Sequence, residues 1–249
     1  MTIRTITIIG EGELKMKLQE LFSKADFKVI MSDLSQDYAK QASESDLVLE
    51  TVSEDIVLKK EVFKNCDVKC HEQAILATTT AAPWITQLAK ATERPEKVVG
   101  LNFTKNPLDD KYLVQIVRGL QTSNDTVQAS KEFLKQAGIT AVELEETPGF
   151  ILDRVIASVV NEAALMYAAK LATLEDIDKM TKVCVNWPMG PFEFADTLGV
   201  DRIVEILESL AQQLGPRYLP CFLLRKMVNA GWLGKKTGRG FYVYSQETA

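Results

Sequence analysis

The sequence of 249 residues contains only one histidine, His71. Histidine is the side chain that most often acts as a general base near neutral pH. His71 lies in "CDVKCHEQAIL", ahead of a short apolar segment that is typical of a strand. In an open parallel sheet the ligand site lies at the carboxyl ends of the strands, and His71 would lie at the opposite end. We therefore predict a surface or loop position for His71.

Other features that are scarce exclude further classes of protein. The net charge is −5 and no run of Lys and Arg occurs, so we expect no nucleic-acid partner. No apolar stretch reaches the length of a membrane span, and the apolar run at the N-terminus is too short for a signal peptide. The cysteines follow no zinc-binding spacing, so we predict no metal site and interpret them as reduced thiols of a cytoplasmic protein. They are Cys66, Cys70, Cys184 and Cys221.

The first half of the chain alternates short apolar segments with segments of helical spacing. Such alternation predicts a doubly wound, mostly parallel sheet covered by helices. The spacing predicts helices over 13–25 and 124–138. We predict strands over 5–10, 27–33, 46–52, 74–80, 98–103, 111–119 and 139–146.

The second half changes to helical patterns after "ETPGF". The spacing predicts helices over 151–172, 173–185, 201–215 and 220–231, and no strand signal interrupts them until "GFYVY" at 240–244. Thr173 is a candidate N-cap, with Asp176 three residues later as in a capping box. We predict a Rossmann-like α/β domain over residues 1–147 and an all-helical domain over 148–249.

The first predicted strand carries part of a dinucleotide-binding fingerprint. Gly10 and Gly12 follow that strand at the start of a helix, and Asp33 ends the second strand. In this layout the glycines permit a tight turn beneath a pyrophosphate, and the acid accepts hydrogen bonds from ribose hydroxyls. These three positions are therefore candidate cofactor-binding residues.

The same fingerprint is incomplete. Lys15 stands where G-x-G-x-x-G has its third glycine. Glu11 and Glu13 would repel a pyrophosphate at the helix N-terminus. Two interpretations remain open: a nucleotide site that binds weakly, or a Rossmann-type domain whose site has been lost.

Several longer runs resemble the short, two-domain type of 3-hydroxyacyl-CoA dehydrogenase. They are "DLVLETVSEDIVLKKEVF", "AILATTT", "ETPGFILDR", "NWPMGPFEFADTLGVD" and "LGKKTGRGFYVY". The resemblance implies NAD-dependent oxidation of 3-hydroxyacyl-CoA to 3-oxoacyl-CoA and a homodimer formed through the helical domain. It also implies that Glu54 and Lys59 lie along the nicotinamide half of NAD. The alternative is that these two residues belong to an exposed helix start.

The catalytic positions depart from the family pattern. The family run G-L-H-F-F-N-P supplies a histidine that takes the hydroxyl proton, and a glutamate in the next strand orients it. Here "GLNFTKNP" has Asn102 and one extra residue, and "YLVQIV" has Gln115. Neither side chain titrates, so the pair cannot act as base and orienter. We predict that Asn102 closes the turn after the fifth strand within hydrogen-bonding reach of Gln115.

Two further departures affect the expected acyl-CoA site. The substrate-facing serine of the family's S-N-T-S-S run corresponds to Ala81, in "TTTAA". The family has a long helical hairpin after the second strand that helps to hold CoA. Here only 12 residues separate Asp33 from Asp46, which leaves room for one short turn or helix.

Replacement chemistry and three functional hypotheses remain open. Asp153 and the group Lys105, Asp109 and Asp110 are candidate bases, although "KNPLDDK" is also typical of a solvated turn. The chain is either a dehydrogenase with an unusual amide pair and reduced or lost activity, or a non-catalytic homologue that binds a nucleotide or acyl ligand. The third hypothesis is an oxidoreductase acting on a smaller substrate without CoA. We expect NAD binding to be weak or lost, and Asp33 to disfavour NADPH.

Overall fold

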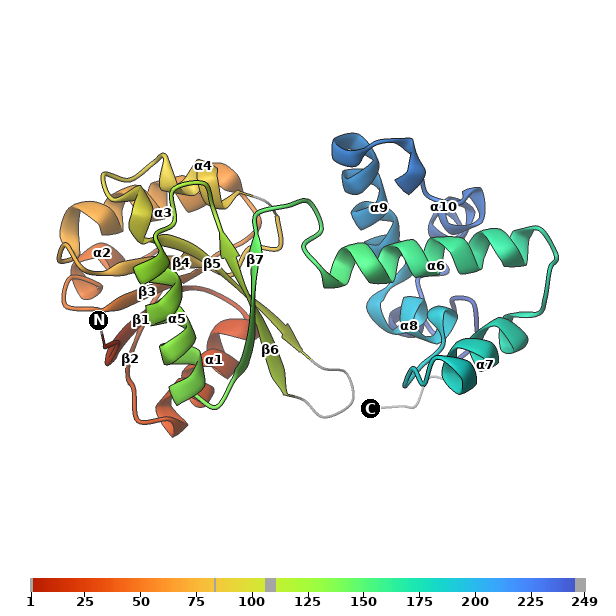
Figure 1. The fold of residues 1–249 in the computed structure, drawn as a ribbon, viewed down its shortest axis with the longest axis horizontal. Coiled ribbons are helices and arrows are strands. Elements are labelled where there is room, and N and C mark those ends of the chain that lie inside the picture. Colours follow the sequence, from red (N-terminus) through yellow and green to blue (C-terminus); the bar gives the residue numbers. More distant parts are fainter. Residues whose placement is uncertain (1, 83, 106–110, 245–249) are drawn as a thin grey trace. The chain divides into compact units, whose positions relative to one another are not determined.

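The computed structural model describes residues 2–82, 84–105 and 111–244, except for the side chain of Lys105. The chain divides into two compact units, Met1–Thr147 and Pro148–Ala249, and each has its own hydrophobic core. The strands belong to the first unit and long helices make up the second (Figure 1). Within the described ranges, no helix combines the length and the apolar character needed to cross a membrane.

The first unit contains one sheet with the strand order β2-β1-β3-β4-β5-β6-β7. All neighbouring strands are parallel except β5 and β6, which are antiparallel. The predicted fold class, a doubly wound and mostly parallel sheet, is confirmed. The strands are β1 (Thr5–Gly10), β2 (Lys28–Ser32), β3 (Leu47–Thr51), β4 (Ile75–Thr78), β5 (Val98–Lys105), β6 (Tyr112–Arg118) and β7 (Thr140–Glu145).

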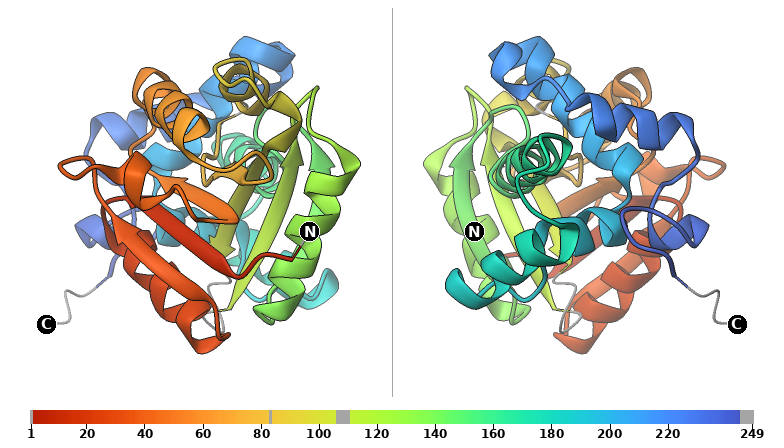
Figure 2. Two further views of the ribbon diagram at one scale, coloured as in Figure 1. Left: turned by 90° about the vertical axis from the view of Figure 1, so that its left-hand side faces the viewer. Right: turned by 90° about the vertical axis from the view of Figure 1, so that its right-hand side faces the viewer.

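Helices cover both faces of this sheet (Figures 1 and 2). On one face α1 and α5 place Leu18, Phe22 and Phe133 in a common core, where the rings of Phe22 and Phe133 lie 4.9 Å apart. On the other face lie α2, α3 and α4. The bounds are α1 (Glu13–Lys24), α2 (Tyr38–Gln41), α3 (Ile56–Lys69), α4 (Ile85–Ala89) and α5 (Asn124–Gln136).

The connection from β2 to β3 is short, as predicted. It contains only the four-residue helix α2, whose first turn is capped by the side chain of Asp37. A helical hairpin is therefore absent between Asp33 and Asp46, all of which the structure describes. His71 lies in the loop before β4, where 40% of its side chain is exposed, and the predicted loop position is confirmed.

The prediction that Asn102 closes a turn is wrong. Strand β5 continues to Lys105, and Asn102 pairs with Gln115 inside the antiparallel ladder of β5 and β6. The ladder extends because β6 supplies hydrogen-bonding partners up to Tyr112, which a view of β5 alone does not reveal. The position of Asn102 is consequently fixed by its pairing with β6, since the pairing of β5 with β4 ends at Gly100.

The second unit is helical, and the N-cap prediction for its second helix is confirmed. Thr173 Oγ1 accepts a hydrogen bond of 3.1 Å from the backbone N–H of Asp176 and donates one of 2.8 Å to its carboxylate. The helices are α6 (Leu152–Ala168), α7 (Leu174–Cys184), α8 (Pro191–Leu198), α9 (Val200–Leu214) and α10 (Phe222–Asn229).

The strand signal in "GFYVY" does not produce a strand in the described part of the chain. This segment forms only isolated bridges, such as the one between Arg239 and Val243. The backbone N–H groups of Phe241 and Tyr242 instead donate to the buried carboxylate of Asp196, each at 2.9 Å. A side chain thus takes the place of a partner strand.

Candidate functional site

The turn between β1 and α1 has the backbone that a dinucleotide site requires. Gly10 has a φ of +142°, and a Cβ there would lie 2.5 Å from Thr51 Oγ1. Gly12 has a φ of +90°, and no atom lies within 4 Å of the place where its Cβ would be. The space in front of the α1 N-terminus is therefore open. Because β1 lies between β2 and β3, this turn is at the topological switch point where such folds bind nucleotides.

The charged residues around this turn have individual partners. Glu13 is exposed and forms an ion pair with Lys17 in the next turn of α1. Glu11 is exposed in the turn itself. Lys15 extends across to the end of β2, where its Nζ donates to the carbonyl oxygen of Ser32 at 2.6 Å. The lysine does not separate α1 from the sheet, since Leu18 of the same helix is fully buried.

Asp33 follows β2 and is partly buried. Its Oδ1 accepts hydrogen bonds from the backbone N–H of Ser35 at 2.9 Å and from the Ser35 hydroxyl at 2.5 Å, while Gln36 Nε2 lies 3.3 Å from Oδ2. The Ser35 hydroxyl is the main cause of a lowered pKa of Asp33. Both oxygens of this carboxylate already accept local hydrogen bonds.

Lys59 is buried, so the alternative that placed it in an exposed helix start is wrong for this residue. Only 1% of the side chain is accessible. Its Nζ donates to Glu50 Oε1 at 2.9 Å, to Glu50 Oε2 at 3.2 Å and to the carbonyl oxygen of Val52 at 3.1 Å. Glu54 is half exposed, lies just before α3 and has its carboxylate 3.9 Å from the same ammonium.

Glu50 is a member of this site that sequence reasoning missed. It lies in β3 and is fully buried, and its carboxylate also accepts hydrogen bonds from Val52 N–H at 2.5 Å and Thr78 Oγ1 at 2.8 Å. Burial raises the pKa of Glu50, and the charge of Lys59 opposes that shift. The available signal was the single acid within "LVLETV", because a charge inside a buried strand needs a partner.

The turn after β4 is held by Glu54. Thr80 Oγ1 donates to Glu54 Oε2 at 2.6 Å, and the backbone N–H of Ala81 donates to Glu54 Oε1 at 2.8 Å. The backbone N–H of Thr80 also donates to Thr78 Oγ1 at 3.2 Å, which connects the turn to Glu50. Ala81 offers this edge of the sheet a methyl group and no hydroxyl.

Asn102 and Gln115 are hydrogen-bonded to each other, as predicted. Gln115 Nε2 donates to Asn102 Oδ1 at 3.0 Å, and Thr104 Oγ1 donates to the same oxygen at 3.2 Å. Asn102 Nδ2 donates to the carbonyl oxygen of Thr80 at 3.3 Å. Hydrogen bonds therefore connect Lys59, through Glu50 and the turn after β4, to the amide pair on β5 and β6.

Of the candidate replacement bases, Asp153 is the one whose side chain the structure describes. Asp153 lies in the first turn of α6 in the second unit, with one carboxylate oxygen 3.9 Å from Arg202. Burial raises its pKa, and Arg202 opposes the shift. Asp109, Asp110 and the side chain of Lys105 lie outside the described residues.

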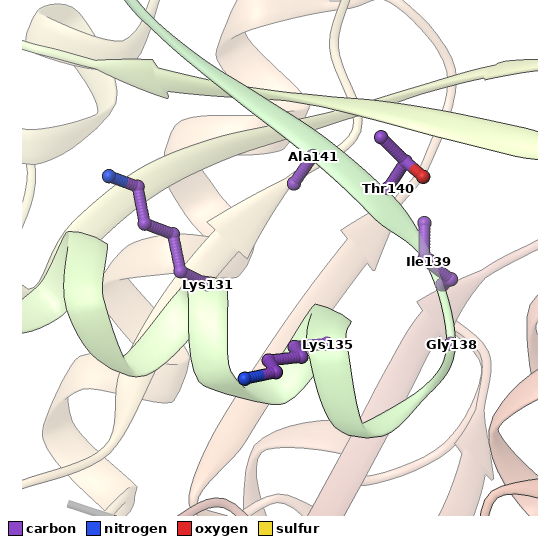
Figure 3. Close-up of a pocket in the computed structure, with 6 residues that line it drawn as sticks. All are labelled: Lys131, Lys135, Gly138, Ile139, Thr140 and Ala141. Atoms are coloured by element: carbon purple, nitrogen blue, oxygen red, sulfur yellow. The ribbon is translucent and has the colours of Figure 1, made fainter.

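A separate cavity of about 450 Å³ lies between α5 and β7 (Figure 3). Figure 3 shows Lys131 and Lys135 on the helix side of this cavity and Thr140 and Ala141 on the strand side. It is lined by none of the predicted site residues, and Lys131 is paired with Glu143 at 2.6 Å. We assign no chemistry to it.

Comparison with protein families gives matches over both halves of the chain. The family model described as "3-hydroxyacyl-CoA dehydrogenase, NAD binding domain" matches residues 34–147. The one described as "3-hydroxyacyl-CoA dehydrogenase, C-terminal domain" matches residues 149–244. The first match begins after Asp33, so the glycine turn and Lys15 lie outside the matched range.

Similar proteins agree with these matches. A probable 3-hydroxybutyryl-CoA dehydrogenase of Bacillus subtilis is 42% identical over 84% of this chain and 73% of its own length. The 3-hydroxybutyryl-CoA dehydrogenase of Bradyrhizobium diazoefficiens is 37% identical over 97% of this chain and 96% of its own. The crystal structure of (S)-3-hydroxybutyryl-CoA dehydrogenase from Ralstonia eutropha has a TM-score of 0.91 at 31% identity, covering 98% of this chain and 100% of that one. The chain therefore belongs to the 3-hydroxyacyl-CoA dehydrogenase family.

Proposed function

We propose that this chain is a divergent 3-hydroxyacyl-CoA dehydrogenase homologue whose classical activity is strongly reduced or lost. The observation that carries the proposal is the amide pair of Asn102 and Gln115, which are joined by a hydrogen bond of 3.0 Å. The family reaction needs a group that removes the substrate hydroxyl proton, and an amide does not bind a proton near neutral pH. The test is the rate of NADH oxidation by the purified protein with acetoacetyl-CoA.

The residues that would contact NAD are Gly10, Gly12, Asp33 and Glu54, while the buried Lys59 would act through Glu54, whose carboxylate lies 3.9 Å from its ammonium. The open turn at Gly12 and the helix N-terminus behind it fit a pyrophosphate. When bound, NAD would supply the acceptor for a hydride from the carbon that bears the hydroxyl group. The chain itself would orient the substrate oxygen through Asn102, without removing its proton.

The amide of Asn102 is already engaged in a way that suits structure more than acid–base chemistry. Its oxygen accepts hydrogen bonds from Gln115 and Thr104, and its nitrogen donates to Thr80. This arrangement keeps the local geometry that an imidazole and a carboxylate would otherwise support. The fold is thereby maintained while the titrating group is missing.

Binding of an acyl-CoA substrate would also be weakened. Ala81 lacks a hydroxyl group that could donate to a substrate oxygen. Helix α2 has four residues, so no long hairpin follows β2 to contact a CoA moiety. These two features support an acyl-CoA site that is less complete than the family pattern implies.

Nucleotide binding is expected to be weak and to improve when the β1–α1 turn is restored. Replacing Lys15→Gly together with Glu11→Ala should strengthen NADH binding by about two- to fivefold. Glu11 would repel the pyrophosphate, and a single charge near a helix N-terminus changes the free energy by up to roughly 1 kcal/mol. Glu13 is left in place because Lys17 already neutralises it. Isothermal titration with NADH measures the change, and Glu72→Ala, at an exposed loop position, is the control. Unchanged affinity in the double variant would show that the pocket is closed for another reason.

We also propose a homodimer formed through the second unit. Six large apolar side chains on and beside α6 and α7 are between 37% and 72% exposed, which is typical of a surface that a partner covers. They are Leu165, Tyr167, Leu171, Met180, Val183 and Val185.

Sedimentation should show a dimer of the 27.8 kDa chain at micromolar concentration. Val183→Asp should shift it toward monomer by at least about tenfold in dissociation constant, because it buries an unpaired charge in the interface. Val68→Asp is the matched control, since Val68 on α3 is also 72% exposed. A wild-type monomer, or equal effects of both substitutions, would contradict the dimer.

One alternative function has an observation in its favour. Asp153 is a half-buried acid whose pKa is raised by burial, as a base for a smaller substrate without CoA would need. Such an enzyme would lose its turnover in Asp153→Asn and keep it in Asn102→Ala. Nucleotide or acyl-CoA binding without any turnover would instead indicate a non-catalytic homologue.

The proposed location is the cytoplasm. The cysteines Cys66, Cys70, Cys184 and Cys221 are all free thiols, as is usual for proteins of that compartment.

A further inference from the structure

We propose that Lys15 is a specificity-determining residue that allows the nucleotide site to accept the 2′-phosphate of NADPH alongside NADH. The inference rests on the proposed function, since it requires a nucleotide to bind at the β1–α1 turn. It concerns the one position in the fingerprint where a glycine is replaced by a cation.

The geometry places the ammonium at the ribose end of the site. In dinucleotide-binding folds, the acid at the end of the second strand faces the adenosine ribose. Here that acid is Asp33, and Lys15 Nζ lies 2.6 Å from the carbonyl oxygen of Ser32, the residue directly before it. The positive charge and the carboxylate are consequently neighbours at the same edge of the sheet.

The hydrogen bonds of Asp33 leave the carboxylate less suited to ribose hydroxyls. Ser35 donates twice to Oδ1, and Gln36 lies within hydrogen-bonding distance of Oδ2. An NAD-specific site depends on the acid binding both ribose hydroxyls and repelling a 2′-phosphate. Because its oxygens already accept hydrogen bonds and a cation lies beside it, Asp33 should discriminate poorly between NADH and NADPH.

Lys15 still has hydrogen-bonding capacity for a phosphate. An ammonium carries three donors, and the contact with Ser32 uses one of them. The side chain is only partly buried, so the remaining donors can reach solvent or a ligand. Lysine at this place would thus act as arginine does near the 2′-phosphate in NADP-binding members of this fold class.

Equilibrium binding tests the proposal without reference to catalysis. Nicotinamide fluorescence is titrated for NADH and NADPH with wild type, Lys15→Met, Lys15→Arg and Lys24→Met. Lys24 is the matched control, since it lies in the last turn of α1 and pairs with Glu20. We expect wild-type dissociation constants for the two nucleotides within about tenfold of each other. Lys15→Met should weaken NADPH by about tenfold, the effect of one hydrogen bond to a charged group, without weakening NADH.

The remaining arms make the outcome unambiguous. Lys15→Arg and Lys24→Met should both retain NADPH binding, and Asp33→Asn should strengthen it. The assignment of Lys15 alone would be overturned if wild type binds NADPH at least about 100-fold more weakly than NADH and Lys15→Met leaves both dissociation constants unchanged. The nucleotide site itself would be overturned if neither NADH nor NADPH binds to the wild type or to the double variant Lys15→Gly with Glu11→Ala. Thermal melting of each variant confirms that it is folded.

Discussion

Purified protein mixed with NADH and acetoacetyl-CoA should turn over at least about 10³-fold more slowly than an ordinary member of the family, because general base catalysis contributes roughly 10²–10⁴-fold. Asn102 and Gln115 hold the places of the base and its orienter, and neither amide binds a proton near neutral pH. The steady-state decrease in NADH absorbance, at saturating nucleotide, measures this rate. Turnover on the order of 10 s⁻¹, the usual enzyme range, would show that another residue supplies the base, and Asp153 and Lys105 would be examined first.

Restoring the titrating pair should recover only part of the activity. In Asn102→His with Gln115→Glu, the imidazole and carboxylate would lie on paired positions of β5 and β6, which suits their hydrogen bond. Ala81 and the four-residue α2 remain, so substrate binding stays weak. Asn65→His with Gln87→Glu is the control, since both of these residues are exposed on α3 and α4. Full recovery would mean that neither the hydroxyl group missing at Ala81 nor the missing hairpin matters for substrate binding.

Glu50→Gln should destabilise the protein by about 3–5 kcal/mol, because it leaves the buried ammonium of Lys59 without a compensating charge. The two side chains are 0% and 1% exposed, and their closest atoms are 2.9 Å apart. Urea unfolding followed by far-ultraviolet circular dichroism measures the free energy of unfolding. The double variant Glu50→Gln with Lys59→Met should regain most of the loss, since it removes both charges and leaves no unpaired buried ion.

A surface acid provides the comparison for this effect. Glu143 pairs with Lys131 and Arg118 at distances of 2.6 and 2.9 Å, and its side chain is 30% exposed. Glu143→Gln should therefore cost less than about 1 kcal/mol. A loss of similar size in Glu50→Gln would show that Lys59 finds another partner, for which Glu54 at 3.9 Å is the candidate.

The sequence by itself determined the fold class and the chemistry that is missing. The alternation of β-rich and helical segments, each a local property, was enough to predict the parallel sheet and the helices that follow it. The replacement of a histidine by Asn102 is visible in a run of eight residues, and the short connection after Asp33 can be counted. Such features depend on neighbours along the chain, so one sequence suffices to find them.

Only the tertiary structure decided which distant residues meet. Glu50 and Lys59 pair because β3 and α3 bury both side chains together, and Lys15 reaches Ser32 because α1 and β2 lie side by side. Asn102 proved to be a strand residue because β6 extends the ladder past it. Asp196 accepts hydrogen bonds from a segment 45 residues away. Local propensity cannot encode these contacts, since burial and strand pairing between distant segments create both the need for a partner and the partner itself.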